Sequence, residues 1–253
     1  MPGRRVRLTR VHVPLPLAAG ATLALPERAA THLVRVLRLR AGDRLAVFDG
    51  AGREHDATLA QVRGERVDVL LGAARTAAAE SPLAITLVQG ISRGERMDYA
   101  IQKATELGVR RIVPVFAERS VVRLDAAQAE RKLEHWRGVA TSACEQCGRA
   151  TLPEVLPPRR YLEFLAEARA PADARHVRLV LAPEGTHGAH DLPDPLSAAE
   201  LLVGPEGGLT ADEENLALAR GFVGLRLGPR ILRTETAAAA AIAALQALRG
   251  DLA

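Results

Sequence analysis

The pattern of apolar and polar positions differs between the first third of the chain and the rest. Up to about residue 75, short apolar runs alternate with turn residues, such as DGAG at 49–52 and RGE at 63–65. This spacing is typical of a small antiparallel barrel or sheet. One helix is predicted within it, because ERAATHLVRVLRL places four apolar residues on one side: Ala30, Leu33, Val34 and Leu37. We therefore expect a small β domain at residues 1–72.

Strands and helices alternate after an unpatterned segment at residues 73–82, which we interpret as a linker. LAITLVQGI and RIVPVFA are continuous apolar runs, as strands buried on both faces would be. The stretches RMDYAIQKATELGV and AAQAERKLEHWRGVATSACEQCGR each carry a helical apolar stripe. This alternation predicts an α/β domain with a largely parallel sheet at residues 83–253.

Three similar turns follow in the last third of the chain. VRLVLAPEG, ELLVGPEGG and VGLRLGPRI each run from an apolar strand to a small residue and then to Pro183, Pro205 or Pro229. If the three strands are parallel neighbours, all three turns emerge at the carboxyl edge of the sheet, where open α/β sheets bind ligands. The glycines at 204, 207, 208 and 228 would let backbone groups contact that ligand directly.

The second turn, GPEGG, narrows the choice of ligand. It lacks the Lys-Ser/Thr ending of a triphosphate-binding loop, and its tip is the carboxylate of Glu206, which would repel phosphates. A ligand with an adenine ring and a positive centre, such as S-adenosylmethionine, suits an acidic, glycine-rich edge. Glu206 could equally serve as an anchor that accepts backbone N–H bonds. Thr210 with Glu213 predicts a capping box, and Thr234 is expected to cap a final helix that ends at Gly250.

Charge is distributed unevenly along the 253 residues, although the net charge is only +4. Residues 1–75 hold 13 Lys and Arg against 7 Asp and Glu, so the whole positive excess lies in the first third. A basic module beside a near-neutral one indicates a polyanionic partner such as nucleic acid, or else merely a solvated basic surface. We predict five RNA-binding residues: Arg4, Arg7, Arg10, Arg35 and Arg38.

Apolar residues make up 48% of the chain without any run long enough to span a membrane, so we expect a cytoplasmic protein. Cys144 and Cys147 lack the further Cys or His residues of a zinc site, and we interpret them as small buried side chains rather than as a redox or metal pair. HGAH at 187–190 is interpreted as a polar loop, and we expect neither a bound metal nor a membrane partner.

The two C-terminal stretches LLVGPEGGLTADE and LRLGPRILRTETAAAAAI resemble the cofactor-binding signature of the SPOUT methyltransferases. More specifically, the chain resembles the RsmE family, which methylates N3 of a uridine in small-subunit (16S) ribosomal RNA. HLVRVLRLRAGDRLAVFDGAG is similar to that family's PUA-like RNA-binding barrel, and RMDYAIQKATELGVRRIVPVFAERSVV and WRGVATSACEQCGRATLPEV are similar to its middle motifs. The resemblance covers nearly the whole chain. Two other functions stay open: a SPOUT enzyme acting on another RNA nucleotide, and an inactive RNA-binding protein.

This resemblance implies a trefoil knot in the C-terminal α/β domain, a homodimer, and ribosomal RNA as partner, in the assembled small subunit. It also implies that S-adenosylmethionine lies against the three turns. The expected cofactor-binding residues are Leu181, Ala182, Pro183, Glu184, Val203, Gly204, Pro205, Glu206, Gly207, Gly208, Leu227, Gly228, Ile231, Leu232 and Arg233.

Methyl transfer to uridine N3 requires groups that position the uridine, stabilise its anion and remove its N3 proton. Arg233 and Arg230 are candidates for holding a substrate phosphate or carbonyl oxygen. Glu235 is a further candidate, or simply a carboxylate placed favourably at a helix N-terminus. The resemblance adds Glu106, Gln146 and Arg149, whose alternative is a structural role, and it leaves the general base unassigned.

Overall fold

The computed structural model describes residues 8–64, 66–167 and 173–252. The chain divides into two compact units, and a short internal segment belongs to the first of them. Unit 1 comprises the chain up to Glu80 together with Cys144–Leu152, and unit 2 comprises Ser81–Ala143 and the chain from Pro153 onward. Strand β5 of unit 1, Arg66–Arg75, extends three residues into the segment interpreted as a linker.

Unit 1 is built on a five-stranded sheet with the strand order β1-β3-β4-β5-β2. The pair β1–β3 is parallel, and the other pairs are antiparallel. DGAG joins β3 to β4 as expected, because the Asp49 carboxylate accepts the N–H groups of Ala51 and Arg53 and so closes the turn. The strand bounds are β1 Thr9–His12, β2 Thr22–Ala24, β3 Arg44–Phe48, β4 Glu54–Arg63 and β5 Arg66–Arg75.

The helix predicted within unit 1 is shorter than expected. It consists of α1, Glu27–Thr31, followed by a π-helical turn at His32–Val36. Ala30 and Leu33 are buried as predicted, whereas the prediction for Leu37 was wrong: 41% of that residue is exposed. The wider π turn changes the angular spacing of the side chains, so the regular helical stripe does not extend to Leu37.

Unit 2 contains a parallel sheet with the strand order β12-β10-β11-β6-β7-β8, and β9 also pairs with β7. Every pairing among its described strands is parallel, which confirms the α/β prediction. The strands are β6 Ala84–Gly90, β7 Arg111–Phe116, β8 Glu154–Val155, β9 Arg159–Arg160, β10 His176–Leu181, β11 Ala198–Val203 and β12 Val223–Leu225.

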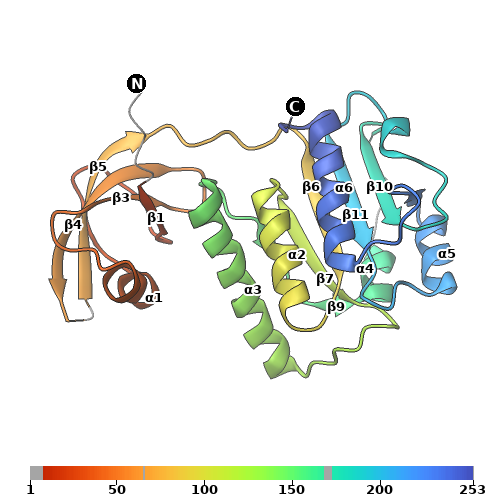
Figure 1. Cartoon of the computed structure of the whole chain (residues 1–253), viewed down its shortest axis with the longest axis horizontal. Coiled ribbons are helices and arrows are strands. Elements are labelled where there is room, and N and C mark those ends of the chain that lie inside the picture. Colours follow the sequence, from red (N-terminus) through yellow and green to blue (C-terminus); the bar gives the residue numbers. More distant parts are fainter. Residues whose placement is uncertain (1–7, 65, 168–172, 253) are drawn as a thin grey trace. The chain divides into compact units, whose positions relative to one another are not determined.

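Helices cover both faces of this sheet, because successive residues of each strand are buried in different cores. Leu87 and Leu201 pack in the core with α2, α3 and α6, whereas Val88 and Leu202 pack in the core with α4 and α5. Figure 1 shows α2 and α6 lying in front of the central strands. The helices are α2 Glu95–Glu106, α3 Ala126–Cys147, α4 Tyr161–Glu167, α5 Ala211–Ala219 and α6 Thr234–Arg249, with a 3-10 turn at Ala189–Asp191.

Helix α3 ends at Cys147, because Gly148 adopts a left-handed conformation with φ +104°. Arg149 therefore lies beyond the helix, although the helical stretch predicted from the sequence extended to it. Among the described residues, no helix is long and apolar enough to cross a membrane.

Candidate functional site

The three proline turns meet at one edge of the sheet of unit 2. Strands β12, β10 and β11 are adjacent and parallel, so Pro229, Pro183 and Pro205 follow their carboxyl ends at the same edge. There the turns surround a cavity of about 530 Å³, a size typical of small-molecule sites. The arrangement predicted from the three sequence repeats is confirmed.

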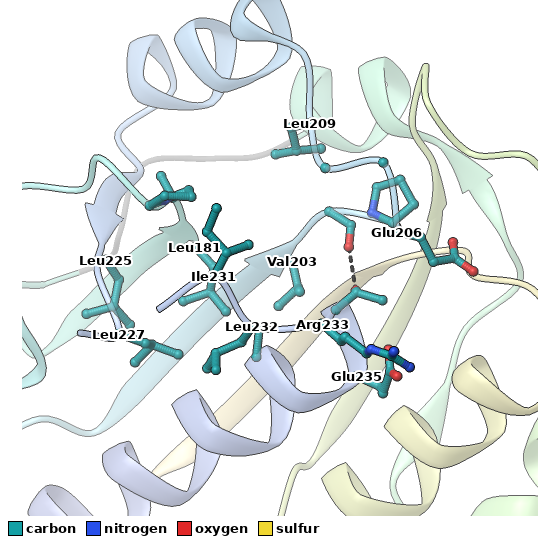
Figure 2. A pocket seen from close by; sticks show the side chains of 18 of the residues that line it. Leu181, Val203, Glu206, Leu209, Leu225, Leu227, Ile231, Leu232, Arg233 and Glu235 are labelled. Carbon is teal, nitrogen blue, oxygen red and sulfur yellow. Dashed lines mark hydrogen bonds between the residues drawn. The ribbon is translucent and has the colours of Figure 1, made fainter. Parts of the chain in front are cut away.

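The cavity has an apolar region and a polar region (Figure 2). Apolar side chains gather on one side, and five of them are Leu181, Leu225, Leu227, Ile231 and Leu232. Ile231 is 86% exposed, which places this large apolar side chain at the rim. Glu206, Arg233 and Glu235 lie together on the other side of the view. A flat heterocycle suits the first region, and charged groups suit the second.

The second turn is held by a close approach of its own backbone. A Cβ atom on Gly204 would lie 2.9 Å from the carbonyl carbon of Gly208 and the nitrogen of Leu209. Gly208 itself has φ +70°, which favours glycine. The missing side chain of Gly204 thus lets the backbone of Gly208 and Leu209 pack against it. The sequence had instead suggested that this space is needed by the ligand.

Thr234 fastens this turn to the last helix. Its hydroxyl donates a 2.6 Å hydrogen bond to the carbonyl oxygen of Gly204 and accepts one of 2.9 Å from the amide of Gln89. The expected cap role of Thr234 was wrong: α6 has Arg233 at its N-cap without a side-chain cap bond. Thr210 does form the predicted capping box with Glu213 at the start of α5.

Glu206 anchors the second turn. Its Oε1 accepts the N–H of Arg93 at 2.8 Å and a guanidinium N–H of Arg96 at 3.0 Å. Burial disfavours the charged carboxylate, but these hydrogen bonds and the charge of Arg96 outweigh it and lower the pKa of Glu206 below its ordinary value. Its Oε2 is buried and has no hydrogen-bond partner within the described protein. One oxygen therefore serves as the anchor, and the other stays available to a ligand.

Glu235 offers a second available acceptor in the same cavity. It stands in the first turn of α6, and its Oε2 is also buried without a hydrogen-bond partner among the described residues. Such a group costs free energy unless a ligand or water satisfies it. Arg233 and Arg230 line the cavity too and are exposed, and the described residues contain no hydrogen-bond or ion-pair partner for either guanidinium.

Several predicted site residues lie elsewhere. Glu184 is exposed and lies outside the cavity lining, unlike the other expected cofactor-binding residues. Glu106 pairs with Lys103 on α2 at 2.9 Å. In unit 1, Gln146 is exposed, whereas Arg149 is buried and pairs with Glu80 at 2.6 Å. Glu106, Gln146 and Arg149 thus lie at the surface or in ion pairs with other protein residues, and none of them belongs to the described lining of the cavity.

Other lining residues were missed by the sequence analysis: Arg96, Leu209, Glu214, Leu225, Thr234 and Ala237. Leu225 could have been found, because it ends the strand before the third turn. Arg96 could not, since it reaches the cavity from α2 through Glu206, 110 positions away in sequence.

The predicted RNA-binding residues have different environments. Arg4 and Arg7 lie outside the described residues. Arg10 is a structural residue rather than part of an exposed basic face: its side chain is 8% exposed, pairs with Glu54 at 2.8 Å and stacks on Phe48. Arg35 and Arg38 are exposed on and after the π turn.

The cysteine pair is placed in unit 1. Cys144 is fully buried and Cys147 partly so. A hydrogen bond between the two thiols lowers the pKa of Cys147 to about 6. Within the part of the chain that the structure describes, His, Cys, Asp and Glu side chains form no group of three or more that could hold a metal ion.

Comparisons with known proteins identify similar chains over nearly the full length. Residues 79–246 match the family model of an RNA methyltransferase domain, and residues 25–72 match that of an RNA methyltransferase PUA domain. The ribosomal RNA small subunit methyltransferase E of Buchnera aphidicola is 32% identical over 97% of this chain and 98% of its own. That of Bacillus subtilis is 32% identical over 87% of this chain and 89% of its own.

Two solved structures with bound S-adenosylmethionine have the same fold. The methyltransferase E of Neisseria gonorrhoeae is 42% identical with a TM-score of 0.91, covering 98% of this chain and all of that one. A methyltransferase from Legionella pneumophila is 38% identical with a TM-score of 0.92 and the same coverage. These matches confirm the predicted fold class, an α/β SPOUT methyltransferase domain with an N-terminal PUA domain.

Proposed function

Since the chain belongs to the family of ribosomal RNA small subunit methyltransferase E, we propose that it methylates N3 of a specific uridine in 16S ribosomal RNA. The observation that carries the proposal is the cavity between the three turns, which lies in the domain matched by relatives crystallised with S-adenosylmethionine. The relatives' names supply the ribosomal RNA substrate.

The cavity fits S-adenosylmethionine in both of its regions. The apolar side chains around Leu181, Leu227 and Leu232 suit an adenine ring, and the backbone of the turns offers hydrogen bonds to its edge. The orphaned Oε2 atoms of Glu206 and Glu235 supply acceptors and negative charge for a cationic ligand. When bound, the cofactor supplies an electrophilic methyl group on a positively charged sulfur.

Glu235 is the residue best suited to take the N3 proton of the uridine. Its buried Oε2 needs a donor, and a uracil N3–H is one. The carboxylate accepts that proton, N3 forms a bond to the methyl carbon, and the electron pair of the broken C–S bond stays on sulfur. The guanidinium groups of Arg233 and Arg230, which have no partner among the described residues, balance the negative charge that develops on the uracil oxygens, or hold the adjacent phosphate.

Residues 1–72 act in this proposal as the PUA-like RNA-binding domain, with Arg35 and Arg38 on its contact face, and residues 83–253 act as the methyltransferase domain. The enzyme works as a homodimer on the small subunit in the cytoplasm. Ile231 supports the dimer, because so large an exposed apolar side chain beside a ligand cavity suits coverage by a partner.

Nucleoside mass spectrometry of ribosomal RNA from a deletion strain tests this function. We expect N3-methyluridine to disappear from 16S ribosomal RNA and to return when the purified protein and S-adenosylmethionine are added to the subunits. Unchanged N3-methyluridine would refute the substrate, and loss of another modified nucleotide would reassign it. If calorimetry detects no cofactor binding, the protein is an RNA binder without methyltransferase activity.

A further inference from the structure

Unit 2 has a second large hollow, distinct from the cofactor cavity. Its volume is about 420 Å³, within the range of ligand sites. Basic and neutral side chains line it, and its described lining contains no carboxylate: Arg123, Leu124, Gln128, Arg131, Lys132 and His135. Arg123 comes from the segment before α3, and the last four come from α3 itself.

Helix α3 gathers basic and neutral residues on the side that lines this hollow. Gln128, Arg131, Lys132 and His135 follow the helical spacing of three, four and seven positions, which places them on one side. Glu130 falls on the opposite side of the helix by the same spacing and is exposed. Glu134 lies three positions after Arg131 and is also exposed, but among the described residues it forms no ion pair with that guanidinium.

The cations of the hollow also lack carboxylate partners. Within the described residues, Arg123, Arg131 and Lys132 form no ion pair or side-chain hydrogen bond. Other arginines of the same unit are paired: Arg111 with Glu154 at 2.7 Å, Arg159 with Glu167 and Arg175 with Asp173. His135 is held by Asp98, with 2.8 Å between its Nε2 and the carboxylate, so it already has a partner.

Contacts between neighbouring residues connect this hollow to the cofactor cavity. Lys132 and Leu124 line both the hollow and a smaller one of about 90 Å³, which Arg93 also lines. Arg93 is exposed, and its backbone N–H donates to Glu206 in the second turn of the cavity. Arg96, in the first turn of α2, lines the cavity itself. Cationic side chains thus continue from the polar region of the cavity to α3.

We propose that Arg123, Arg131 and Lys132 bind phosphate groups of the ribosomal RNA strand that flanks the methylated nucleotide. The inference rests on the proposed function and adds an RNA contact on the methyltransferase domain itself, outside the PUA domain. Unpaired cations along a path toward the reacting nucleotide match a strand that carries one negative charge per nucleotide. Such contacts fix the register of the strand without reading its bases.

A charge-neutralising variant and a matched control test the inference. The test variant combines Arg123→Gln, Arg131→Gln and Lys132→Gln; the control combines Arg111→Gln, Arg159→Gln and Arg175→Gln, which removes three paired cations from the same unit. The dissociation constant for 16S ribosomal RNA is measured against salt concentration. Three lost contacts, at roughly 0.7 each for single strands, should make the slope of log K against log salt shallower by about two in the test variant alone.

Cofactor affinity by calorimetry and the melting temperature serve as checks, and both should stay unchanged in the test variant. Equal salt slopes for the wild type and the test variant would overturn the inference while leaving the methyltransferase function intact. Equal losses in both variants would also overturn it, because the effect would then come from net charge. Failure of the wild-type protein to bind or methylate ribosomal RNA would instead refute the proposed function.

Discussion

The hydroxyl of Thr234 donates a 2.6 Å hydrogen bond to the carbonyl oxygen of Gly204 and accepts another from Gln89, whose amide is fully buried. One hydroxyl thereby joins the end of β6, the turn after β11 and the start of α6. These three segments lie far apart in the sequence, and two of them form walls of the cofactor cavity. The shape of the cavity therefore depends on Thr234, whose hydroxyl is used in hydrogen bonds within the protein.

Replacing Thr234 with Val keeps the shape of the side chain and removes both hydrogen bonds. Leaving buried groups unsatisfied should cost about 1–3 kcal/mol in the free energy of unfolding. It should also weaken cofactor binding, because the second turn loses its tie to α6. Denaturant unfolding and calorimetry measure the two effects. Thr234→Ser, which retains the hydroxyl, is the control, and an equal loss in both variants would contradict this role.

Gly204→Ala and Gly228→Ala should have different effects. A Cβ at position 204 meets backbone atoms at 2.9 Å, so the second turn must open and cofactor affinity should fall sharply. At position 228 no heavy atom lies within 4 Å of the added Cβ, and the cost is the strain of φ +73°, about 1–2 kcal/mol. Calorimetry on both variants checks this order. If Gly204→Ala binds the cofactor more tightly than Gly228→Ala does, the close approach of Gly204 to the backbone of Gly208 and Leu209 is unimportant for cofactor binding.

Glu235→Gln tests the proposed proton acceptor. The amide cannot take the N3 proton, so the single-turnover rate of methylation should fall about 10²- to 10⁴-fold, while cofactor binding is retained. The control is Glu95→Gln, which removes an exposed carboxylate from the first turn of α2. A rate equal to that of the wild type, with an unchanged pH profile, would exclude Glu235 as the base.

The anchor role of Glu206 predicts a pH-dependent stability. Its pKa is lower in the folded protein than the ordinary value of 4.5, so the charged carboxylate stabilises the fold above that value. Glu206→Gln should therefore melt at a lower temperature than the wild type at neutral pH. As the pH falls below 4.5 and through the lowered pKa, the wild type loses this contribution and the two melting curves should converge. A constant difference across that range would count against the anchor.

The exposed arginines of unit 1 can be tested by a double variant. Arg38 has φ +56°, so Asn, which tolerates the left-handed region, is a better replacement there than Ala. Arg35→Gln with Arg38→Asn should weaken ribosomal RNA binding and reduce its salt slope by about one. The control, Arg53→Gln with Arg66→Gln, removes two cations of the same unit that lie outside the proposed contact face and that pair with Asp49 and Asp68, and it should leave the slope unchanged.

Local patterns in the sequence predicted much of this molecule. The buried strands of unit 2, the stripe on α2 and the capping box at Thr210 all follow from residues close together in the chain. The cavity was also predictable, because three repeated strand-to-proline turns on parallel neighbours must meet at one edge. The trefoil knot was implied by resemblance alone, since periodicity carries no information about threading.

Tertiary contacts and one left-handed glycine account for what the sequence analysis missed. Arg10 looks like part of a basic face until Glu54 and Phe48 are placed around it. Thr234 looks like a helix cap, but its hydroxyl instead donates to the carbonyl oxygen of Gly204 and accepts from the amide of Gln89. Arg149 looks helical until Gly148 ends α3. In each case a tertiary partner or a left-handed residue overrides the local preference.

The position of the cavity residues in the sequence also determines when the cavity forms during synthesis. Apart from Arg96, every described lining residue lies after position 180. A ribosome that has made 180 residues has already delivered all the segments of unit 1 and strands β6 to β9. Nascent chains therefore hold no cofactor until the segment from Leu181 to Ala237 has been made, and they gain the stability that ligand binding confers only afterwards.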